Sequence, residues 1–458
     1  MKLYALAALW LAGSGLWAQQ PAPATQLTIG QAVESALRNY PSIRVSQEQM
    51  NAAAAGIRLA QTAYLPRVDA LAQMNRATRN TFYGLLLPQG VIPGVDGIRA
   101  DNLGSVWDSG VGLLVTWQPF DFGLRRANVA AATAARAQAQ AAITRTQYDV
   151  SVATADAFLT VVAAQQTAQA ARAAVDSWQI LLGGIHALVG AELRPGADES
   201  RVQAESALAR TQFAQAEQAI EVARSTVAKF VGLGPAQVNL NPGALVDRLP
   251  ADKPTRALDV GAHPVALEQN AAVAQEQSRL QSLQRTYRPQ FVLQGVAAAR
   301  GTGMEADGAR LGGLNGLAPT TQNYGLGLTV TFPVMDRFGI REQEAVQTAN
   351  IRAGQAQYQL IAANLQAQFN AVLATLAGAR RVAANTPIEV SAATASFEQA
   401  TARYKSGLAP IDDVAQAQRL LVQARIDDSL ARLNVWRALL ELETARGDIR
   451  PFLDEAAQ

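Results

Sequence analysis

The sequence predicts an α+β membrane protein in which pairs of membrane-spanning β-strands alternate with long helical hairpins. Three observations predict this fold: an internal repeat, period-two alternation in four short segments, and two helical segments of unusual length. In the repeat, Tyr40–Pro41 returns as His263–Pro264, shifted by 223 positions, and residues 111–117 return as residues 326–332, shifted by 215. Segments that recur in the same order at nearly constant separations indicate two copies of one supersecondary unit. Neither copy has the pattern of an independent domain.

The composition excludes several classes of function. The 458 residues include 39 Lys and Arg against 37 Asp and Glu, so no basic surface for a nucleic-acid partner is expected. Cysteine is absent, which excludes disulfides and thiolate chemistry. His186 and His263 lie far apart, outside any metal-ligand spacing, and are expected to be solvent-exposed helix residues. No nucleophile–base pair, metal cluster or phosphate loop is recognisable, so we expect no enzyme, no cofactor and no metal site.

The N-terminus is typical of a secretory signal peptide. Met1–Lys2 gives a minimal basic start, Leu3–Trp17 is largely apolar, and Ala18 precedes a polar run. We expect cleavage near Ala18, with an uncleaved anchor as the alternative. No later segment has about 18 consecutive apolar residues without a charge, so any further membrane crossing must use strands.

Four segments alternate between apolar and polar residues, as membrane strands do when one face meets lipid and the other a polar lumen. They form two pairs, within residues 64–120 and 287–335, and the connecting residues 82–105 and 302–321 are rich in Gly, Pro and Asn, as exposed loops are. Half-buried strands of a soluble sandwich are the alternative. The residues predicted to face lipid are Val111, Leu113, Val115, Trp117, Leu326, Leu328, Val330 and Phe332.

The helical segments are unusually long. No proline falls between Leu124 and about residue 187, and the counterpart from residue 340 to about 406 is interrupted only by Pro387. After turns with glycine and proline, return helices are expected over 199–231 and 413–446. A coiled-coil seam with alternating spacings of four and three is predicted through Tyr148, Val152, Ala155, Leu159 and Val162.

These patterns divide the chain into consecutive segments. They are a signal peptide (1–18), an N-terminal segment with a first helix (19–63), the first barrel strand pair (64–120), the first helical hairpin (121–231), a connecting equatorial segment (232–262), the helix that opens the second repeat (263–286), the second strand pair (287–335), the second hairpin (336–446) and a C-terminal tail (447–458).

Four strands are too few to close a barrel in a membrane. An open sheet in lipid leaves unpaired backbone groups at its edges, and natural barrels begin at about eight strands. The chain must therefore pool its strands with copies of itself, giving eight strands from two chains or twelve from three. An eight-strand barrel is nearly filled by side chains. A polar lumen that continues into a helical tube favours three copies.

The duplicated order of strand, loop, strand, long helix, turn and return helix resembles the TolC-type outer-membrane efflux proteins. The residues that carry the resemblance are Tyr64–Pro66, Trp117–Gly123 with Pro333–Gly339, and Arg403–Gly407 leading to Asp412–Val414. The resemblance implies a homotrimer with a twelve-strand barrel in the outer membrane, surrounded by its lipid, and a helical tunnel in the periplasm. It also implies a passive export channel for drugs, metals or other substrates, served by a periplasmic adaptor protein and an inner-membrane efflux pump. A soluble periplasmic coiled-coil scaffold is the alternative.

The same resemblance implies a periplasmic gate at the helical turns. Asp198 and Tyr404 stand where the family links its two hairpins, but Ala409 replaces the arginine expected five residues after that tyrosine. Arg194 or Arg403 would then be the substitute.

Two further roles at the turns follow from the resemblance. Asp413 fits a ring of carboxylates at the constriction, although Gln416 replaces a second one. For Asp198 and Asp413, the alternative is a helix N-cap or first-turn carboxylate. The residues expected at the adaptor-docking tip are Val189, Gly190, Ser406, Gly407 and Leu408.

Overall fold

The computed structural model describes residues 26–78, 105–254, 256–303, 305 and 310–458. The signal peptide predicted over 1–18, with its cleavage site, and nearly all of the loop predicted over 82–105 lie outside the described residues. The chain divides into two compact units, and each unit takes residues from both copies of the repeat. We call residues 42–146 and 259–367 the sheet unit, and residues up to 41 with 147–258 and 368–458 the hairpin unit.

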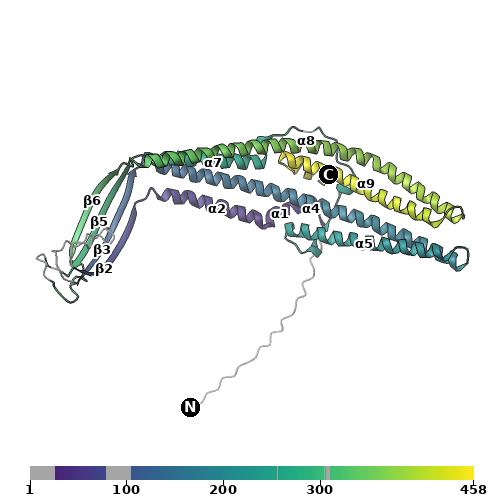
Figure 1. The fold of residues 1–458 in the computed structure, drawn as a ribbon, viewed down its shortest axis with the longest axis horizontal. Helices are drawn as coiled ribbons and strands as arrows, with labels where there is room; N and C mark the ends of the chain where they lie inside the picture. Colours follow the sequence, from purple (N-terminus) through teal and green to yellow (C-terminus); the bar gives the residue numbers. More distant parts are fainter. Residues whose placement is uncertain (1–25, 79–104, 255, 304, 306–309) are drawn as a thin grey trace, which may run out of the picture. The chain divides into compact units, whose positions relative to one another are not determined.

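The sheet unit contains one four-stranded antiparallel sheet (Figure 1). Its strand order is β2–β3–β5–β6, so the two copies of the repeat meet where β3 pairs with β5. Within the described residues, β2 pairs only with β3 and β6 only with β5, which leaves both outer strands as edges. The bounds are Arg67–Thr78 for β2, Ser105–Phe120 for β3, Gln290–Thr302 for β5 and Thr321–Thr331 for β6.

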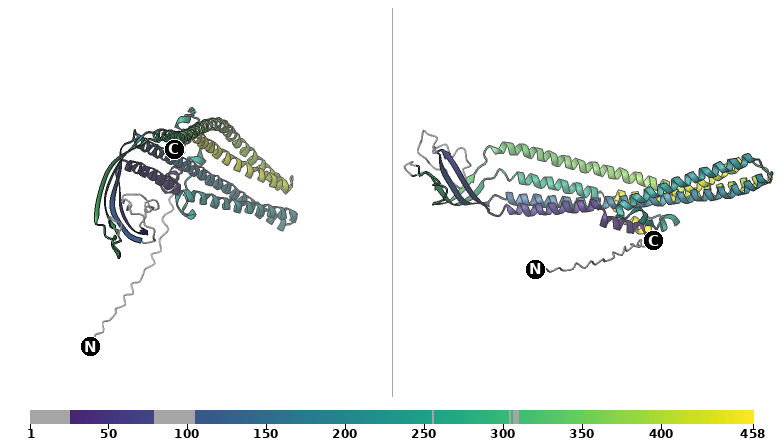
Figure 2. Two further views of the ribbon diagram at one scale, coloured as in Figure 1. Left: turned by 60° about the vertical axis from the view of Figure 1, so that its left-hand side comes forward. Right: turned by 90° about the horizontal axis from the view of Figure 1, so that it is seen from below.

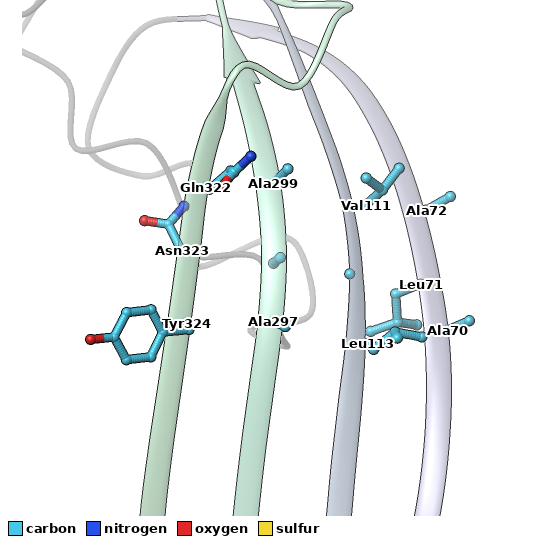
Figure 3. Close-up of a pocket in the computed structure, with 12 residues that line it drawn as sticks. Ala70, Leu71, Ala72, Val111, Leu113, Ala297, Ala299, Gln322, Asn323 and Tyr324 are labelled. Atoms are coloured by element: carbon cyan, nitrogen blue, oxygen red, sulfur yellow. The ribbon is translucent and has the colours of Figure 1, made fainter.

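The register aligns the apolar positions of all four strands in rows. Leu113 lies opposite both Ala70 and Ala297, and Ala297 lies opposite Tyr324. Figure 3 shows this row and the neighbouring one, at the edge of a hollow of about 930 Å³. Since directly paired residues point to the same side of a sheet, one face collects the apolar side chains. The members of this apolar face include Val68, Ala70, Val111, Leu113, Val115, Trp117, Leu293, Tyr324, Leu326, Leu328 and Val330.

The opposite face of the sheet is less polar than the alternation predicts. It carries Arg67, Thr116 and Gln294 in one row, but Leu114 and Val296 lie in the next row beside Asp69. The second face, predicted to be polar, is therefore apolar in the middle of the sheet. In that row the neighbour on the edge strand is Gly325, whose missing side chain leaves space for Val296.

Helices extend from the sheet in this unit. They are α2 (Pro41–Thr62), α7 (Pro264–Leu283) and the first parts of α4 (Leu124–Gly190) and α8 (Asp336–Lys405). Arg145 pairs with Glu268 at 2.8 Å, and the Gln269 side chain donates to the Gly354 carbonyl at 2.9 Å. Among the described helices, α8 alone is long and apolar enough to cross a membrane, which for a single helix is weak support for a span.

His263 is buried, so the prediction that it is a solvent-exposed helix residue is wrong. It is the N-cap of α7, and its ring nitrogen Nδ1 accepts a hydrogen bond from the Val265 N–H at 3.3 Å. Pro264 follows at the first helical position, where the missing N–H has no helical partner to lose. The His-Pro pair is thus a helix start, and the histidine ring is buried there.

The hairpin unit holds α5 (Gly196–Val231), α9 (Ile411–Arg446) and the later parts of α4 and α8. Ala155, Leu159 and Val162 are fully buried, as the predicted seam requires. Pro387 does not interrupt its helix, contrary to the prediction, because α8 continues to Lys405. The adjacent Thr386 donates to Asp428 of α9 at 2.8 Å, so contact with the return helix holds this region in place.

The connecting segments form a small cap on the hairpin unit. β1 (Gln26–Leu27) pairs in parallel with β4 (Asn239–Leu240), beside α1 (Ile29–Asn39) and α6 (Ala244–Asp247). The C-terminal tail is in fact mostly a helix, α10 (Arg450–Ala457). Phe452 of α10 is fully buried against Trp436, at 6.2 Å between ring centroids, which explains why these residues fold. The short 3₁₀ helix Pro235–Gln237 also belongs to this cap, and a second one, Val260–Ala262, precedes α7 in the sheet unit.

Candidate functional site

The two turns between long and return helices have matching backbones. α4 and α5 are joined by residues 191–195, and α8 and α9 by residues 406–410. In the first turn the Leu193 N–H donates to the Leu188 carbonyl at 2.9 Å, and in the second the Leu408 N–H donates to the Arg403 carbonyl at 2.8 Å. In each turn an N–H thus bonds to the carbonyl five residues earlier. This is the 6→1 hydrogen bond of the Schellman motif, which ends a helix. Both turns lie at the same end of the hairpin unit (Figure 2).

The left-handed residue of each turn differs between the copies. In the second turn it is Gly407, with φ of 76°, as expected of a glycine. In the first turn it is Glu192, with φ of 59°, and not Gly190, which is the last residue of α4. The prediction that both turns use a glycine is therefore wrong for the first. Of the predicted docking residues, Gly190, Ser406, Gly407 and Leu408 are exposed and Val189 is half-buried.

Tyr404 links the second turn to the first. Its ring is 2% exposed and packs in a cluster with Ile185, Val202 and Val414. Its hydroxyl donates to the Asp198 carboxylate at 2.9 Å. Burial, together with this hydrogen bond, raises the pKa of Tyr404 to about 12. The sequence-predicted pair of Asp198 and Tyr404 is thus brought into contact.

Arg194 also contacts Tyr404. Its Nη2 donates to the Tyr404 carbonyl oxygen, and its guanidinium carbon lies 4.5 Å from the centroid of the Tyr404 ring. Of the two arginines considered as substitutes for the one missing at Ala409, Arg194 is therefore the one placed at the tyrosine. Arg403 is exposed and forms no ion pair within the described part of the chain.

A second set of contacts, which the sequence did not predict, joins α5 to α9. Arg201 lies 3.2 Å from the Asp412 carboxylate, and Arg419 lies 3.0 Å from the carboxylate of Glu205. The Glu205 side chain is only 8% exposed and is also 3.7 Å from Arg201. The spacing of Arg201 and Glu205 by four residues was a visible signal for a pair within one helix. Nothing in the sequence indicated the partners across the two helices.

Asp198 and Asp413 occupy equivalent places on the return helices. Each is the third helical residue, after the N-caps Pro195 and Pro410, so the N-cap alternative is wrong and the first-turn alternative holds. A carboxylate there interacts favourably with the positive end of the helix dipole. Asp413 is exposed, and among the described residues its carboxylate has no hydrogen-bond or ion-pair partner.

The remaining chemistry of this site is limited. His186 is exposed, as predicted, and its Nδ1 is 2.7 Å from the Glu199 carboxylate. No group of His, Asp and Glu side chains in the described ranges is arranged to hold a metal ion. What the site offers is a set of polar links between two hairpins. Each such link is worth about 0.5–1.5 kcal/mol when hydrogen-bonded, and exposed ion pairs are worth less.

A second ordered polar cluster lies where β3 passes into α4. Arg125 is 7% exposed and lies 2.8 Å from the Asp121 carboxylate, with its guanidinium stacked 4.7 Å from the centroid of the Tyr64 ring. It also donates to the carbonyls of Ala63 and Pro119. Burial acts to raise the pKa of Asp121, but hydrogen bonds from Arg125 and from the Gly123 N–H outweigh it and lower the pKa.

The sequence matches a family described as outer membrane efflux protein over residues 32–233 and 263–448. Solved structures share the fold at low identity. The outer-membrane channel OprN is 18% identical, with a TM-score of 0.71, over 92% of this chain and 89% of its own. VceC of Vibrio cholerae is 18% identical, with a TM-score of 0.71, over 92% and 96%. CusC is 13% identical, with a TM-score of 0.74, over 92% of each chain. No curated protein sequence matches this chain.

Proposed function

The chain belongs to the outer membrane efflux protein family, and from this premise we propose that it is the outer-membrane channel of a tripartite efflux or secretion system. It lies in the cell outer membrane with its helical tunnel in the periplasm, and it is not an enzyme. The outer-membrane location removes the alternative of a soluble periplasmic scaffold. In the proposed role the channel is a passive duct for drugs, metals or other substrates, which an inner-membrane pump and a periplasmic adaptor hand over.

The open sheet is the observation that carries the proposal. Its edges are β2 and β6, and one face is apolar across all four strands. In lipid, unpaired edge groups are too costly to leave open, so β2 of one copy must pair with β6 of the next. Three copies would contribute twelve strands, enough to enclose a lumen. The apolar face would then meet the lipid, with Val111, Leu326 and Phe332 on it.

The helical turns are proposed as the docking tip for the adaptor. Leu193 and Leu408, which are equivalent in the repeat, are 69% and 72% exposed. Two exposed leucines at tight helix ends suit contact with another helical hairpin, whose apolar side chains would cover them. The turn residues Gly190, Ser406 and Gly407 would surround this contact.

We also propose that the links around Tyr404 hold the periplasmic end closed. Asp198 and Arg194 come from the first hairpin and its turn, and Tyr404 from the second. The pairs Arg201–Asp412 and Arg419–Glu205 join the same two hairpins further along the return helices. The hairpins can separate only if these contacts break.

The number of copies is the first quantity to measure. Native mass spectrometry of the full-length protein in detergent should give a mass of three chains, because twelve strands close a barrel with a lumen. Purified channels should conduct ions in planar bilayers. A stable assembly of two chains, with no larger one, would refute the twelve-strand arrangement.

Weakening the gate should raise the conductance of single channels. The double variant Asp198→Ala with Tyr404→Phe removes one hydrogen bond and keeps the buried ring, so its packing with Ile185 and Val202 is preserved. This bond contributes about 0.5–1.5 kcal/mol, or more because an ionised group takes part, and either single change should already remove it. Adding Arg194→Ala should raise the conductance further.

A separate experiment concerns Asp413. We propose that the Asp413 carboxylates of the assembled copies form a ring at the constriction. Asp413→Asn should weaken the preference of the channel for cations, since a ring of carboxylates selects cations by its field. Glu217→Gln is the matched control, because it removes the same charge from an exposed residue of α5 that forms no ion pair within the described residues. Equal selectivity in both variants and unchanged conductance in the double variant would reduce these residues to stabilisers of the return helices.

A further inference from the structure

A cavity of about 800 Å³ lies in the sheet unit where the strands of the second copy join its helices. Its lining includes four arginines and a single carboxylate. Arg285 and Arg288 come from the segment between α7 and β5, and Arg337 and Arg341 from the first turns of α8. All four side chains are exposed, and Glu344 is the only acidic residue of the lining.

The four guanidinium groups make few contacts with other described residues of the chain. Arg285 donates to the Phe122 carbonyl at 3.3 Å, and Arg288 lies 5.2 Å from the centroid of the Tyr287 ring. Among the described residues, Arg337 and Arg341 form no ion pair or hydrogen bond. Like charges gathered around one cavity repel each other, so an anion that enters it gains from all of them.

The equivalent position of the first copy shows a different arrangement. Tyr64 corresponds to Tyr287 in the repeat, and Arg125, two residues after Gly123, corresponds to Arg341, two residues after Gly339. In the first copy the arginine is buried, stacked on the tyrosine and paired with Asp121. In the second copy that arginine lines an open cavity with three others. A basic cavity is therefore not needed to pass from strand to helix.

We propose that this cavity binds the phosphate of an anionic phospholipid head group from the periplasmic leaflet of the outer membrane. Guanidinium groups bind phosphate oxygens in pairs of hydrogen bonds, which suits a cluster of arginines. The lining residue Arg288 comes two residues before the start of β5, and Arg337 six residues after the end of β6, where the sheet's apolar face ends. The exposed apolar residues of this junction are Phe332, Val334, Met335 and Phe338. Acyl chains would lie on these side chains, which a free phosphate ion would not need.

The proposal depends on the chain's location in the outer membrane and not on its role as an export channel. The test is native mass spectrometry of the full-length protein with added phosphatidylglycerol, and with phosphatidylcholine of the same acyl chains. Arg337→Gln with Arg341→Gln should weaken binding of phosphatidylglycerol by about fivefold for each arginine. The lysine pair at the same positions keeps the charge and should lose less. The same spectra count the chains, so a failure of the trimer is read separately from a failure of lipid binding.

The matched control is Arg126→Gln with Arg136→Gln, two exposed arginines of α4 that form no ion pair within the described residues. It removes the same charge and should leave binding of phosphatidylglycerol within about twofold, because these arginines do not line the cavity. Equal losses in both pairs would overturn the site in favour of general attraction to charge. Displacement of the lipid by millimolar inorganic phosphate would assign the site to a free anion instead. Loss of trimer with unchanged lipid binding would assign the arginines to a neighbouring copy.

Discussion

Leu113→Lys should prevent the protein from assembling in the outer membrane. Leu113 lies near the middle of β3, in a row with Ala70, Ala297 and Tyr324, and half of its side chain surface is exposed in the single chain. A lysine facing lipid near the bilayer midplane costs about 2–4 kcal/mol, and each copy in the assembly would carry that cost. Leu328→Lys, on the same face of β6, should behave in the same way.

The control for this experiment is Thr116→Lys, three residues along the same strand. Thr116 pairs with Arg67 and Gln294 on the opposite face, so a lysine there would meet a polar neighbourhood. Outer-membrane fractionation and gel analysis of the folded trimer measure the outcome. Equal tolerance of Leu113→Lys and Thr116→Lys would show that the lipid face has been assigned to the wrong side of the sheet.

Arg125→Ala should destabilise the protein by about 3–5 kcal/mol, the usual cost of removing one partner of a buried ion pair. The change leaves Asp121 without its guanidinium partner and leaves the carbonyls of Ala63 and Pro119 without their donors. Arg126→Ala is the control, because the neighbouring arginine is exposed and makes none of these contacts. Urea-dependent unfolding in detergent, followed by tryptophan fluorescence, compares the two variants.

The same variant should alter the response to acid. The pKa of Asp121 is lowered in the folded protein, so its pairing with Arg125 stabilises the fold above the unfolded-state pKa of about 4. That contribution is lost as the pH falls through the lower, folded-state value. Without Arg125 the stability should therefore fall less steeply below about pH 4 than it does in the native protein. An unchanged acid limb would mean that the pair contributes little.

The strands were predictable because apolar and polar residues alternate along each of them with a period of two. The alternation sets which residues share a side within each strand, and the register then places Leu113 and Leu326 on one face. The other face was predicted to be more polar than it is, because Leu114 and Val296 each break the alternation. Only the register shows that these two residues lie in the same row. The long helices were predictable from the lack of proline. The interruption expected at Pro387 does not occur, and the adjacent Thr386 donates a hydrogen bond to Asp428 of α9.

The candidate gate was only partly predictable. Asp198 and Tyr404 followed from the family resemblance, and they lie in hydrogen-bond contact. Arg419 and Glu205 could not be paired from the sequence, because a contact between helices depends on how each helix is rotated about its axis. Burial of Phe452 was missed for a related reason. It lies in a short helix whose core neighbours are distant in the chain.

The protonation of Tyr404 has a consequence for how the proposed gate responds to its surroundings. With a pKa of about 12, the phenol stays a hydrogen-bond donor through the whole range of acidity that a cell envelope meets. Ionic strength acts differently, because Arg201, Arg419 and Asp412 are about half-exposed or more and their attraction is screened by dissolved salt. Ionic strength in the periplasm, and not deprotonation of Tyr404, is therefore the variable to which the proposed gate should respond.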